Sequence, residues 1–260
     1  MGRKFNPSKI KISNISIPLP RLPVDFDGYR MVQLSDFHLG TWLDGLDMKE
    51  IVEIVNQLEP DLIAITGDFV NTDPERYTAI LIQALSMFRA ADCTVAVLGN
   101  HDHYTDSKII REILQRSDII ELRNRIHPIQ RNKAFLYLAG IDDRLTKNDD
   151  LHSVIDQIPD ENCSVILLAH EPDFADISAK SGKFDMQISG HTHGGQICLP
   201  FIGNLYLPRL GRKYPSGKYQ IGDMVLYTNR GLGTSWLKIR YNCPPEISVF
   251  TLRSPLIQNH

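Results

Sequence analysis

Histidines in two short, glycine-flanked strings are the residues of this chain best placed to do chemistry. The string Gly190-His191-Thr192-His193-Gly194 carries two imidazoles on alternate residues, and Gly99-Asn100-His101-Asp102 sets a side-chain amide beside a third. Imidazole, carboxylate and amide groups are ligands of hard to borderline divalent metals. Paired histidines between glycines have few structural uses, so these strings predict a metal site.

Three further positions supply the rest of a metal-ligand inventory. They are Asp36-Phe37-His38, Gly67-Asp68 and His170. Two cations held close together repel each other unless an anion bridges them, and the carboxylate of Asp68 can span two ions about 3.5–4 Å apart. The inventory therefore predicts a pair of divalent metal ions, the arrangement that suits phosphoryl transfer. From the residues alone, His191 and His193 could serve one ion together or one ion each.

Each candidate ligand follows a short apolar run, and these runs alternate with helical patterns. The predicted strands cover residues 31–34, 62–65, 95–98, 135–141, 165–169, 184–188, 225–228 and 247–252. Asp47, with Glu50 three residues on, predicts a capped helix that ends before Pro60, and Asp73-Pro74 opens another. Ligands gather outside the carboxyl ends of strands in sheet-and-helix folds, so we expect these side chains to meet at such an edge.

The bulk properties are those of one soluble globular domain. The chain has 260 residues, 42% of them hydrophobic and 23% charged, and no repeat or linker divides it. We expect a single domain over 1–260, with an N-terminal arm over 1–28 and a loop or cap over the site at 196–218. The formal net charge of −3 disfavours a nucleic-acid partner.

Cysteine usage and the lengths of the apolar runs bear on where the protein resides. The four cysteines lie far apart, and Cys93 and Cys163, beside apolar runs, are expected to be buried free thiols in a reducing compartment. No stretch resembles a signal peptide or approaches about 18 apolar residues. We therefore expect a cytoplasmic protein. The basic segment 3–11 leaves open a peripheral contact with the inner membrane face, as an alternative to a solvated arm or an edge strand.

The segment Ile197–Tyr214 directly follows the histidine pair and mixes apolar residues with cations. Its members include Phe201, Ile202, Leu205, Tyr206, Arg209, Arg212 and Lys213, and the later Trp236, Lys238 and Arg240 could join the same rim. Such a mixture suits an amphiphilic phosphate ester, with acyl chains on one side and anionic oxygens on the other. The alternative is a packed loop that only covers the edge of a sheet.

Taken in order, the strings resemble the calcineurin-like metallophosphoesterase family. The resemblance rests on Asp36-Phe37-His38, Gly67-Asp68, Gly99-Asn100-His101-Asp102, His170 and Gly190-His191-Thr192-His193, and covers residues from about 29 to 252. The tail strings Arg230-Gly231-Leu232-Gly233 and Pro244-Pro245-Glu246-Ile247 resemble its bacterial YkuE/YaeI-like subgroup. The resemblance implies an α/β fold, a four-layer αββα sandwich with two mixed sheets, around a two-metal site.

The resemblance also implies a role for each motif residue. Asp36, His38, Asp68 and His193 would hold one ion, and Asp68, Asn100, His170 and His191 would hold the other. His101 would stay free of the metals, stabilise the phosphoryl oxygens and protonate the leaving group. Asp102 would orient His101, with a helix-capping or turn role as the alternative. We expect two divalent ions, Mn²⁺ first, with Fe or Zn²⁺ also suited to histidine-plus-carboxylate sites.

The predicted reaction is hydrolysis of a phosphodiester or pyrophosphate by metal-activated water. One alternative is a hydrolase of a UDP-2,3-diacylglucosamine-type lipid precursor. Others are a phosphomonoesterase and a non-catalytic metal-binding scaffold. A small-molecule or lipid-linked phosphate ester is the expected partner, and the oligomeric state stays open. A metallo-β-lactamase fold is excluded, because that fold opens with H-x-H-x-D-H whereas this chain opens with Asp36-x-His38 and keeps its H-x-H for late in the sequence.

The remaining histidines are weaker candidates. His103 could contact a metal ligand, His127 is expected in a loop, and His152 and His260 are expected at the surface. The pair Asp142-Asp143 follows a predicted strand and suggests a third metal, but a turn after the strand is the simpler interpretation.

Overall fold

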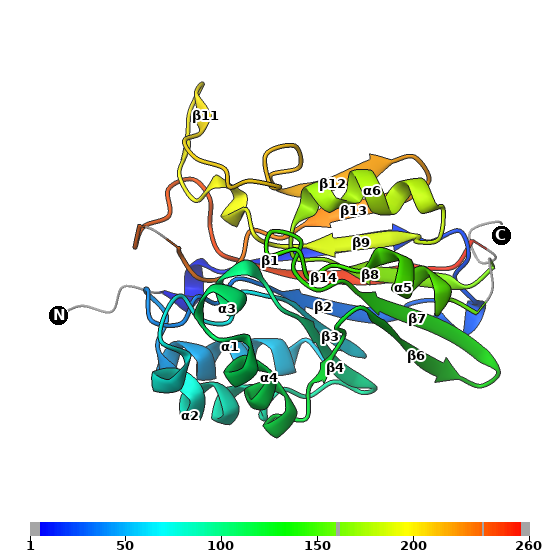
Figure 1. Ribbon diagram of the computed structural model, residues 1–260, viewed down its shortest axis with the longest axis horizontal. Helices are drawn as coiled ribbons and strands as arrows, with labels where there is room; N and C mark the ends of the chain where they lie inside the picture. The colour runs from blue at the N-terminus through cyan, green and yellow to red at the C-terminus, as the bar shows by residue number, and fades with distance from the viewer. Residues whose placement is uncertain (1–5, 160–161, 236, 256–260) are drawn as a thin grey trace.

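Two β-sheets lie face to face and helices cover the outer face of each, as the computed structural model shows for residues 6–159, 162–235 and 237–255 (Figure 1). The strand order is β1-β14-β2-β3-β4-β5 in the first sheet and β12-β13-β9-β8-β7-β6 in the second. Both sheets mix parallel and antiparallel pairs. The expected four-layer αββα sandwich with two mixed sheets is confirmed.

The first sheet contains the strands that precede the early candidate ligands. Its members are β1 (Lys11–Pro18), β2 (Arg30–Leu34), β3 (Leu62–Thr66), β4 (Cys93–Val97), β5 (Ile120–Glu121) and β14 (Glu246–Arg253). Strands β2 to β5 run parallel, so their carboxyl ends share one edge. Strand β1 lies within the segment 1–28, expected to be an N-terminal arm, and pairs in parallel with β14 at the edge of the sheet. Only Lys11 of the basic segment 3–11 belongs to this strand.

The second sheet contains the strands that precede the late candidate ligands. Its members are β6 (Arg125–Arg131), β7 (Ala134–Gly140), β8 (Ser164–Leu168), β9 (Met186–Ser189), β12 (Gly217–Ile221) and β13 (Met224–Thr228). Strands β7, β8, β9 and β13 are parallel. His127 lies in β6, so the loop expected there is wrong: Pro128, which suggested it, is accommodated because β6 is an edge strand of the sheet.

Helices pack on both outer faces. They are α1 (Gly45–Gln57), α2 (Pro74–Leu85), α3 (Asn100–Thr105), α4 (Ser107–Arg116), α5 (Leu151–Asp156) and α6 (Ala175–Ser178), with short 3₁₀ turns η1 (Pro7–Lys9), η2 (Val24–Phe26), η3 (Pro172–Phe174), η4 (Ala179–Ser181) and η5 (His193–Gly195).

Asp44, rather than Asp47, caps α1: its carboxylate accepts from the backbone N–H groups of Leu46 and Asp47. Asp47 returns a bond to the Asp44 N–H, so the predicted cap is displaced by three residues.

Three apolar cores separate the four layers. Alternate residues of a strand face opposite sides, and in β3 Leu62 and Ala64 pack between the sheets while Ile63 and Ile65 pack against α1, α2 and α4. A third core lies between the second sheet and its helices, where Val154 of α5 and Ala175 of α6 are buried. The sheets are thereby held rigid on both faces, which fixes the loops at their ends.

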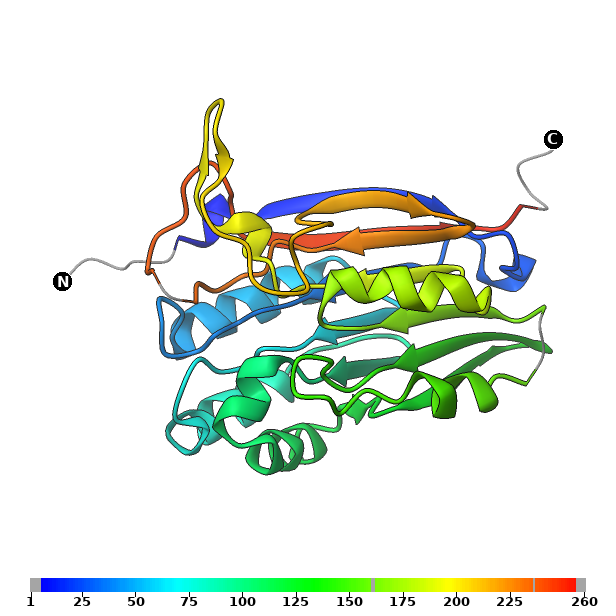
Figure 2. The same cartoon turned by 45° about the horizontal axis from the view of Figure 1, so that its top comes forward.

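A two-stranded hairpin, β10 (Cys198–Leu199) and β11 (Gly203–Asn204), projects from one end of the sandwich (Figure 2). It belongs to the segment 196–218 that was expected to form a loop or cap. Among the described residues, no helix is both long and apolar enough to cross a bilayer.

All four cysteines are free, but Cys93 and Cys163 are only half-buried, contrary to expectation, and Cys243 is the buried one. Cys93 is the first residue of β4 and Cys163 precedes β8, so both lie at strand ends rather than within the buried strands.

Candidate metal centre

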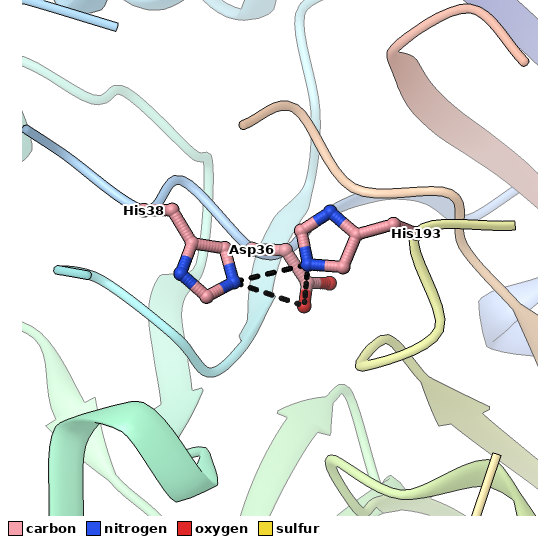
Figure 3. Close-up of side chains that lie close together, drawn as sticks. All are labelled: Asp36, His38 and His193. Carbon is pink, nitrogen blue, oxygen red and sulfur yellow. Dashed lines mark hydrogen bonds and ion pairs between the residues drawn. The ribbon is translucent and has the colours of Figure 1, made fainter. Parts of the chain in front are cut away.

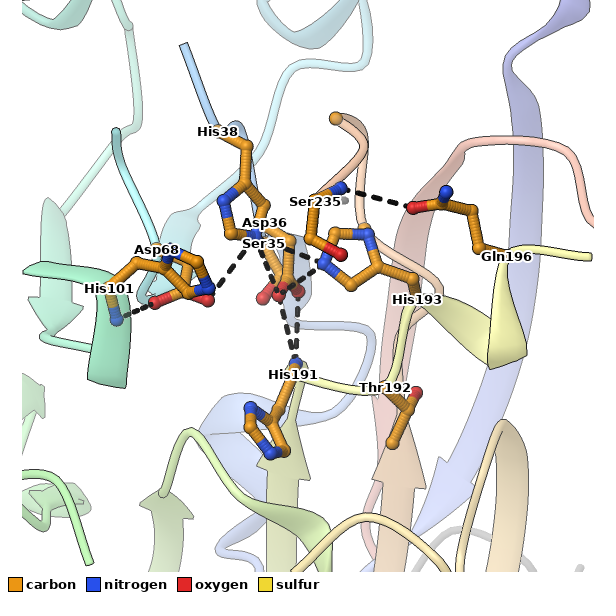
Figure 4. A network of polar contacts seen from close by, with 12 residues as sticks. Ser35, Asp36, His38, Asp68, His101, His191, Thr192, His193, Gln196 and Ser235 are labelled. Atoms are coloured by element: carbon orange, nitrogen blue, oxygen red, sulfur yellow. Dashed lines mark hydrogen bonds and ion pairs between the residues drawn. The ribbon is translucent and has the colours of Figure 1, made fainter. Parts of the chain in front are cut away.

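The candidate ligands converge from five loops, each at the carboxyl end of a parallel strand. Asp36 and His38 follow β2, Asp68 follows β3, and Asn100 and His101 follow β4. The second sheet supplies the rest: His170 follows β8, while His191 and His193 follow β9. The two edges face each other, and side chains far apart in the sequence therefore meet at one place (Figure 4).

The backbone of these loops is unusual in a way that aims the side chains. Asp36, His38, Asp68, His191 and His193 all have left-handed backbone, with φ values of 52°, 44°, 57°, 71° and 53°. Residues other than glycine adopt this region at a cost in free energy, and such residues cluster at functional sites. The turns bring alternate residues of an otherwise extended string onto one side, which D-x-H and H-x-H need if both members are to reach the same point.

The first donor group consists of Asp36, His38 and His193 (Figure 3). The Nε2 atoms of His38 and His193 lie 3.0 Å apart, and Asp36 Oδ1 lies 3.5 Å from His193 Nε2 and 3.9 Å from His38 Nε2. All three side chains are buried. Two imidazole nitrogens and a carboxylate oxygen thus face one point.

The second donor group consists of Asp68, His170 and His191. His170 Nε2 lies 3.2 Å from both Asp68 Oδ2 and His191 Nδ1. A carbonyl oxygen can only accept, so His170 Nδ1, 2.6 Å from the Thr66 carbonyl, and His191 Nε2, 2.8 Å from the Arg209 carbonyl, are donors. The other ring nitrogens, His170 Nε2 and His191 Nδ1, face each other.

Asp68 links the two groups, since it is a member of the second and also contacts His38 of the first. Its Oδ2 lies 3.2 Å from His38 Nε2 as well as 3.2 Å from His170 Nε2, and its Oδ1 accepts from the backbone N–H of His101. The loop of Gly99 passes so close that an added Cβ would collide with the Asp68 carboxylate and the His170 ring. Glycine is required at 99 for this contact, which places a carboxylate between the two groups as a bridging ligand must be.

The protonation preferences suit ligands. Burial opposes ionisation of Asp68, but His170 and His38 outweigh it and hold the pKa of Asp68 well below its ordinary value. Burial lowers the pKa of His191 to about 3 and that of His193 well below the usual range, so both imidazoles stay neutral. Burial alone would lower the pKa of His170, but Asp68 outweighs burial and raises it. Burial raises the pKa of Asp36. Metal ligation needs neutral imidazoles and ionised carboxylates, so binding at the latter two would release protons.

Two buried atoms of the candidate ligands lack the partners that their burial demands. Asn100 Oδ1 and His38 Nδ1 have no hydrogen-bond partner within the part of the chain that the structure describes. A buried acceptor without a partner is costly, and a bound cation would satisfy the Asn100 oxygen. Together with two pairs of facing imidazole nitrogens and a shared carboxylate, this donor set fits two divalent cations.

Asp102 does not take the role expected first. Its buried carboxylate accepts from the backbone N–H groups of Gly99, Asp68 and Phe69, each at 2.9 Å. No hydrogen bond joins it to the His101 ring among the described residues. The interpretation that Asp102 orients His101 is therefore wrong in this structure, because three main-chain donors already occupy the carboxylate. Burial raises the pKa of Asp102 to about 7.

A cavity of about 720 Å³ opens above the donor groups. His101 lies in its wall, its Nδ1 3.4 Å from the Asn71 carbonyl oxygen and its ring edge-on to that of His38. Tyr104, Tyr206 and Arg209 line the cavity as well. Tyr104 was missed from the sequence because helix α3 was not predicted; three residues from His101 on a helix, it had to share that face.

Of the other side chains expected near the site, one lies behind it, some lie outside the described residues, and one contacts a residue that is not a candidate ligand. Arg240 is a half-buried residue behind the site: it donates to the carbonyls of Arg230, Gly231 and Gly233 and lies 3.3 Å from His193 Nδ1. Trp236, expected on the same rim, and His260 lie outside the described residues. His103 contacts Asp142 at 2.6 Å rather than a ligand, which agrees with the turn interpretation of Asp142-Asp143.

The chain belongs to the calcineurin-like phosphoesterase family, whose sequence profile matches residues 29–195. It is 34% identical to YkuE, an uncharacterised metallophosphoesterase of Bacillus subtilis, over 97% of this chain and 89% of YkuE. It is 27% identical to phosphodiesterase YaeI of Escherichia coli, over 86% and 82%. A Danio rerio transmembrane protein with a metallophosphoesterase domain is 28% identical over 94% of this chain and 57% of that protein.

These comparisons confirm the resemblance drawn from the motifs, including its YkuE/YaeI-like subgroup. The family implies a phosphoesterase with a dinuclear divalent metal centre, and the two donor groups are where this chain would hold it.

Proposed function

We propose that this protein hydrolyses a phosphodiester with the help of two divalent cations. The observation that carries the proposal is the sharing of Asp68 between two imidazole–carboxylate groups at the floor of the cavity whose wall holds His101. This arrangement supports the assignment of Asp68 as a bridging anion, of the two groups as terminal ligands and of His101 as a separate proton carrier.

The residues divide into two ligand sets. Asp36, His38 and His193 with Asp68 would hold one cation. Asp68 with Asn100, His170 and His191 would hold the second. When bound, such a pair lowers the pKa of water toward neutrality and offsets charge on the phosphoryl oxygens. We propose Mn²⁺ as the native metal, because the set mixes carboxylate and amide oxygens with imidazoles.

His101 would supply the proton that the departing oxygen needs. Because the Asn71 carbonyl accepts, His101 Nδ1 carries hydrogen, and the second ring nitrogen is left for the cavity. When the water oxygen bonds to phosphorus, the bond from phosphorus to the leaving oxygen breaks. To act as a general acid, the His101 ring would carry a proton on the cavity-side nitrogen as well as on Nδ1, and the cavity-side proton would pass to that oxygen.

The lining of the cavity supports a diester over a monoester. Arg209 is the one lysine or arginine that lines it among the described residues, which suits a singly charged diester better than a doubly charged monoester. Tyr104, Leu145, Tyr206 and Pro208 offer apolar surface to the second ester group. The name phosphodiesterase given to the relative YaeI agrees with this preference. The same surface would accept the diacyl portion of a nucleotide-linked lipid precursor, which is the second candidate substrate.

The test compares two chromogenic esters. Protein stripped of metal with a chelator is assayed on bis-(p-nitrophenyl) phosphate and on p-nitrophenyl phosphate, before and after addition of Mn²⁺, Fe²⁺ or Zn²⁺. We expect turnover of the diester that requires metal and exceeds turnover of the monoester. A preference for the monoester would overturn the diester assignment. Bound metal without turnover of either ester would favour a non-catalytic scaffold.

A further inference from the structure

The hairpin formed by β10 and β11 exposes apolar side chains at its tip. Phe201 is fully exposed, and Ile202 is 72% exposed. Both views of the molecule show the hairpin projecting beyond the body of the sandwich (Figures 1 and 2). A single exposed apolar residue needs no explanation, but an aromatic and a β-branched side chain together at the end of a projection do.

A second segment extends this apolar surface. Leu237 and Ile239 are exposed, and the chain that carries them is joined to the hairpin base by the Ile197–Tyr241 bridge and by a bond from the Cys198 N–H to the Tyr241 carbonyl. We call the exposed apolar set the spur. Its members are Phe201, Ile202, Leu205, Leu237 and Ile239.

The two chain segments that carry the spur contain charged residues of one sign only. Residues 195–222 and 237–245 contain no aspartate or glutamate, although the whole chain has 31 acidic residues. The same two segments contain six basic residues, namely Arg209, Arg212, Lys213, Lys218, Lys238 and Arg240. Lys238 also lines a hollow of about 560 Å³ with Lys9 of η1. Lys213 is paired with Asp176, and Arg240 lies behind the metal site. The other four, Arg209, Arg212, Lys218 and Lys238, are exposed cations of the segments that carry the apolar tip.

We propose that the spur inserts into a lipid surface that carries negative charge. An apolar projection with lysine and arginine behind it matches a bilayer, because the apolar side chains reach the acyl region while the cations meet the anionic headgroups. A protein partner would have to offer both an apolar pocket for the tip and an acidic collar around it. A membrane offers both without any specific shape.

Docking in this way would bring the catalytic cavity to the membrane. Tyr206, Pro208 and Arg209 continue the chain directly from the hairpin and line the cavity, and the Arg209 carbonyl holds His191. Phosphate esters embedded in the bilayer would then reach the metal ligands without leaving the surface. This consequence rests on the proposed phosphodiesterase activity, whereas the docking itself does not.

The first experiment measures sedimentation of the full chain with vesicles of phosphatidylcholine alone or with added phosphatidylglycerol. We expect binding to the anionic vesicles that weakens as salt is added. The double variant Phe201→Ser/Ile202→Ser should bind at least about tenfold more weakly, since it removes the apolar tip. Arg212→Ala and Lys238→Ala should each weaken binding roughly fivefold at low salt.

The matched control is Val24→Ser, which removes a half-exposed apolar side chain (49%) at η2, at the end of the molecule opposite the hairpin in both views. This control should bind like the wild type. A second readout places tryptophan at the tip. The emission of Phe201→Trp, taken as a difference from wild type, should shift to the blue with anionic vesicles, and that of Val24→Trp should not.

Several outcomes would overturn the inference. Equal binding by wild type and the double variant would do so, and so would binding that ignores phosphatidylglycerol. If the wild type does not bind vesicles but forms a dimer, and the double variant is a monomer, the spur would be a contact with a second copy of the chain. Hydrolysis of bis-(p-nitrophenyl) phosphate, measured in parallel, should be unchanged in the double variant. If wild type binds vesicles but hydrolyses neither ester, the proposed function fails and the docking surface stands.

Discussion

The two sheets contribute to the candidate metal centre in different ways. The loops of the first sheet bring all of the candidate oxygen ligands, Asp36, Asp68 and Asn100, together with His38. The loops of the second sheet bring imidazoles alone, His170, His191 and His193. The carboxylates of the site thus come from the loops of the first sheet, and most of its imidazoles come from the loops of the second. Neither half holds a complete ligand set.

Contacts across the sheets explain how the halves stay in register. The backbone N–H of His191 donates to both oxygens of Asp36, at 3.0 and 3.1 Å. Deeper in the core, Gln33 Nε2 of β2 donates to the Ser189 carbonyl at the end of β9. The site is therefore a product of sheet packing, and variants that act on one half at a time can test the division.

The largest effect is expected when the shared anion is removed. Asp68→Ala deletes a ligand of both groups, so metal content and turnover should fall together, with kcat/KM reduced at least about a thousandfold. Metal analysis beside diester hydrolysis checks this. Asp118→Ala is the matched control, because Asp118 is exposed and has the same left-handed backbone, with φ of 57°. Retention of both metals by Asp68→Ala would end the bridging assignment.

The next effect separates chemistry from metal binding within the first half. His101→Ala should keep its metals and lose about a hundredfold to a thousandfold in turnover, as expected for loss of a general acid. The loss should be smaller for esters whose leaving group needs no proton, such as p-nitrophenolate. Loss of metal in step with activity would instead make His101 a ligand, an arrangement that its distance from His38 and Asp68 also permits.

A pH-dependent effect tests the neutral character of the second half. Burial raises the pKa of Glu171, next to His170, to about 8, and Asp143 reinforces the shift. Below that value the folded protein holds a proton that the unfolded chain, with an ordinary pKa near 4.5, has released. The free energy of unfolding of metal-free protein should therefore fall as pH rises from about 4.5 to 8, by at most about 1.4 kcal/mol per pH unit from this group.

Glu171→Gln should flatten that dependence, because a carboxamide has no proton to lose. Denaturant titrations of metal-free protein at several pH values measure it. Glu112→Gln, on the exposed side of α4, should leave the profile as it is in wild type. An unchanged slope in Glu171→Gln would mean that this carboxyl is ionised in the folded protein.

The smallest effect concerns a contact that ties the halves together away from the metals. His103 on α3 bonds to Asp142, which follows β7, but Arg111 and Arg123 also contact this carboxylate, at 3.2 and 3.1 Å. His103→Ala should therefore cost only about 1–2 kcal/mol in unfolding free energy and leave metal content unchanged. His152→Ala, which breaks an exposed pair with Asp156, should have a smaller effect than His103→Ala, because solvent screens that pair.

Much of this architecture follows from local patterns in the sequence. The apolar runs before Asp36, Asp68, His170 and His191 marked the strands, because a strand buried on both faces needs uninterrupted apolar residues. Their polar successors marked the loops at the carboxyl edge. The grouping of those side chains then follows from parallel pairing, which brings all such edges together.

What the sequence did not reveal depends on long-range contacts. The position of Asp102 next to His101 in the sequence suggested a contact between their side chains. The Asp102 carboxylate instead accepts from main-chain N–H groups of the Asp68 loop, 34 residues away in sequence. The Arg209 carbonyl that fixes the tautomer of His191 carries no residue-type signal at all. Helix α3 was missed since its six residues have too little apolar periodicity to stand out from a turn.

Strand β14 has a consequence for how the protein is made. It lies between β1 and β2, so on the ribosome β1 waits for its neighbour while some 230 further residues are synthesised. Until then the edge of β2, the strand that leads to Asp36, is open to pairing with other chains. The first sheet, and with it the candidate metal centre, is therefore completed only after β14 has been synthesised. A chain released before β14 would carry every predicted ligand and still lack the completed sheet that holds four of the seven.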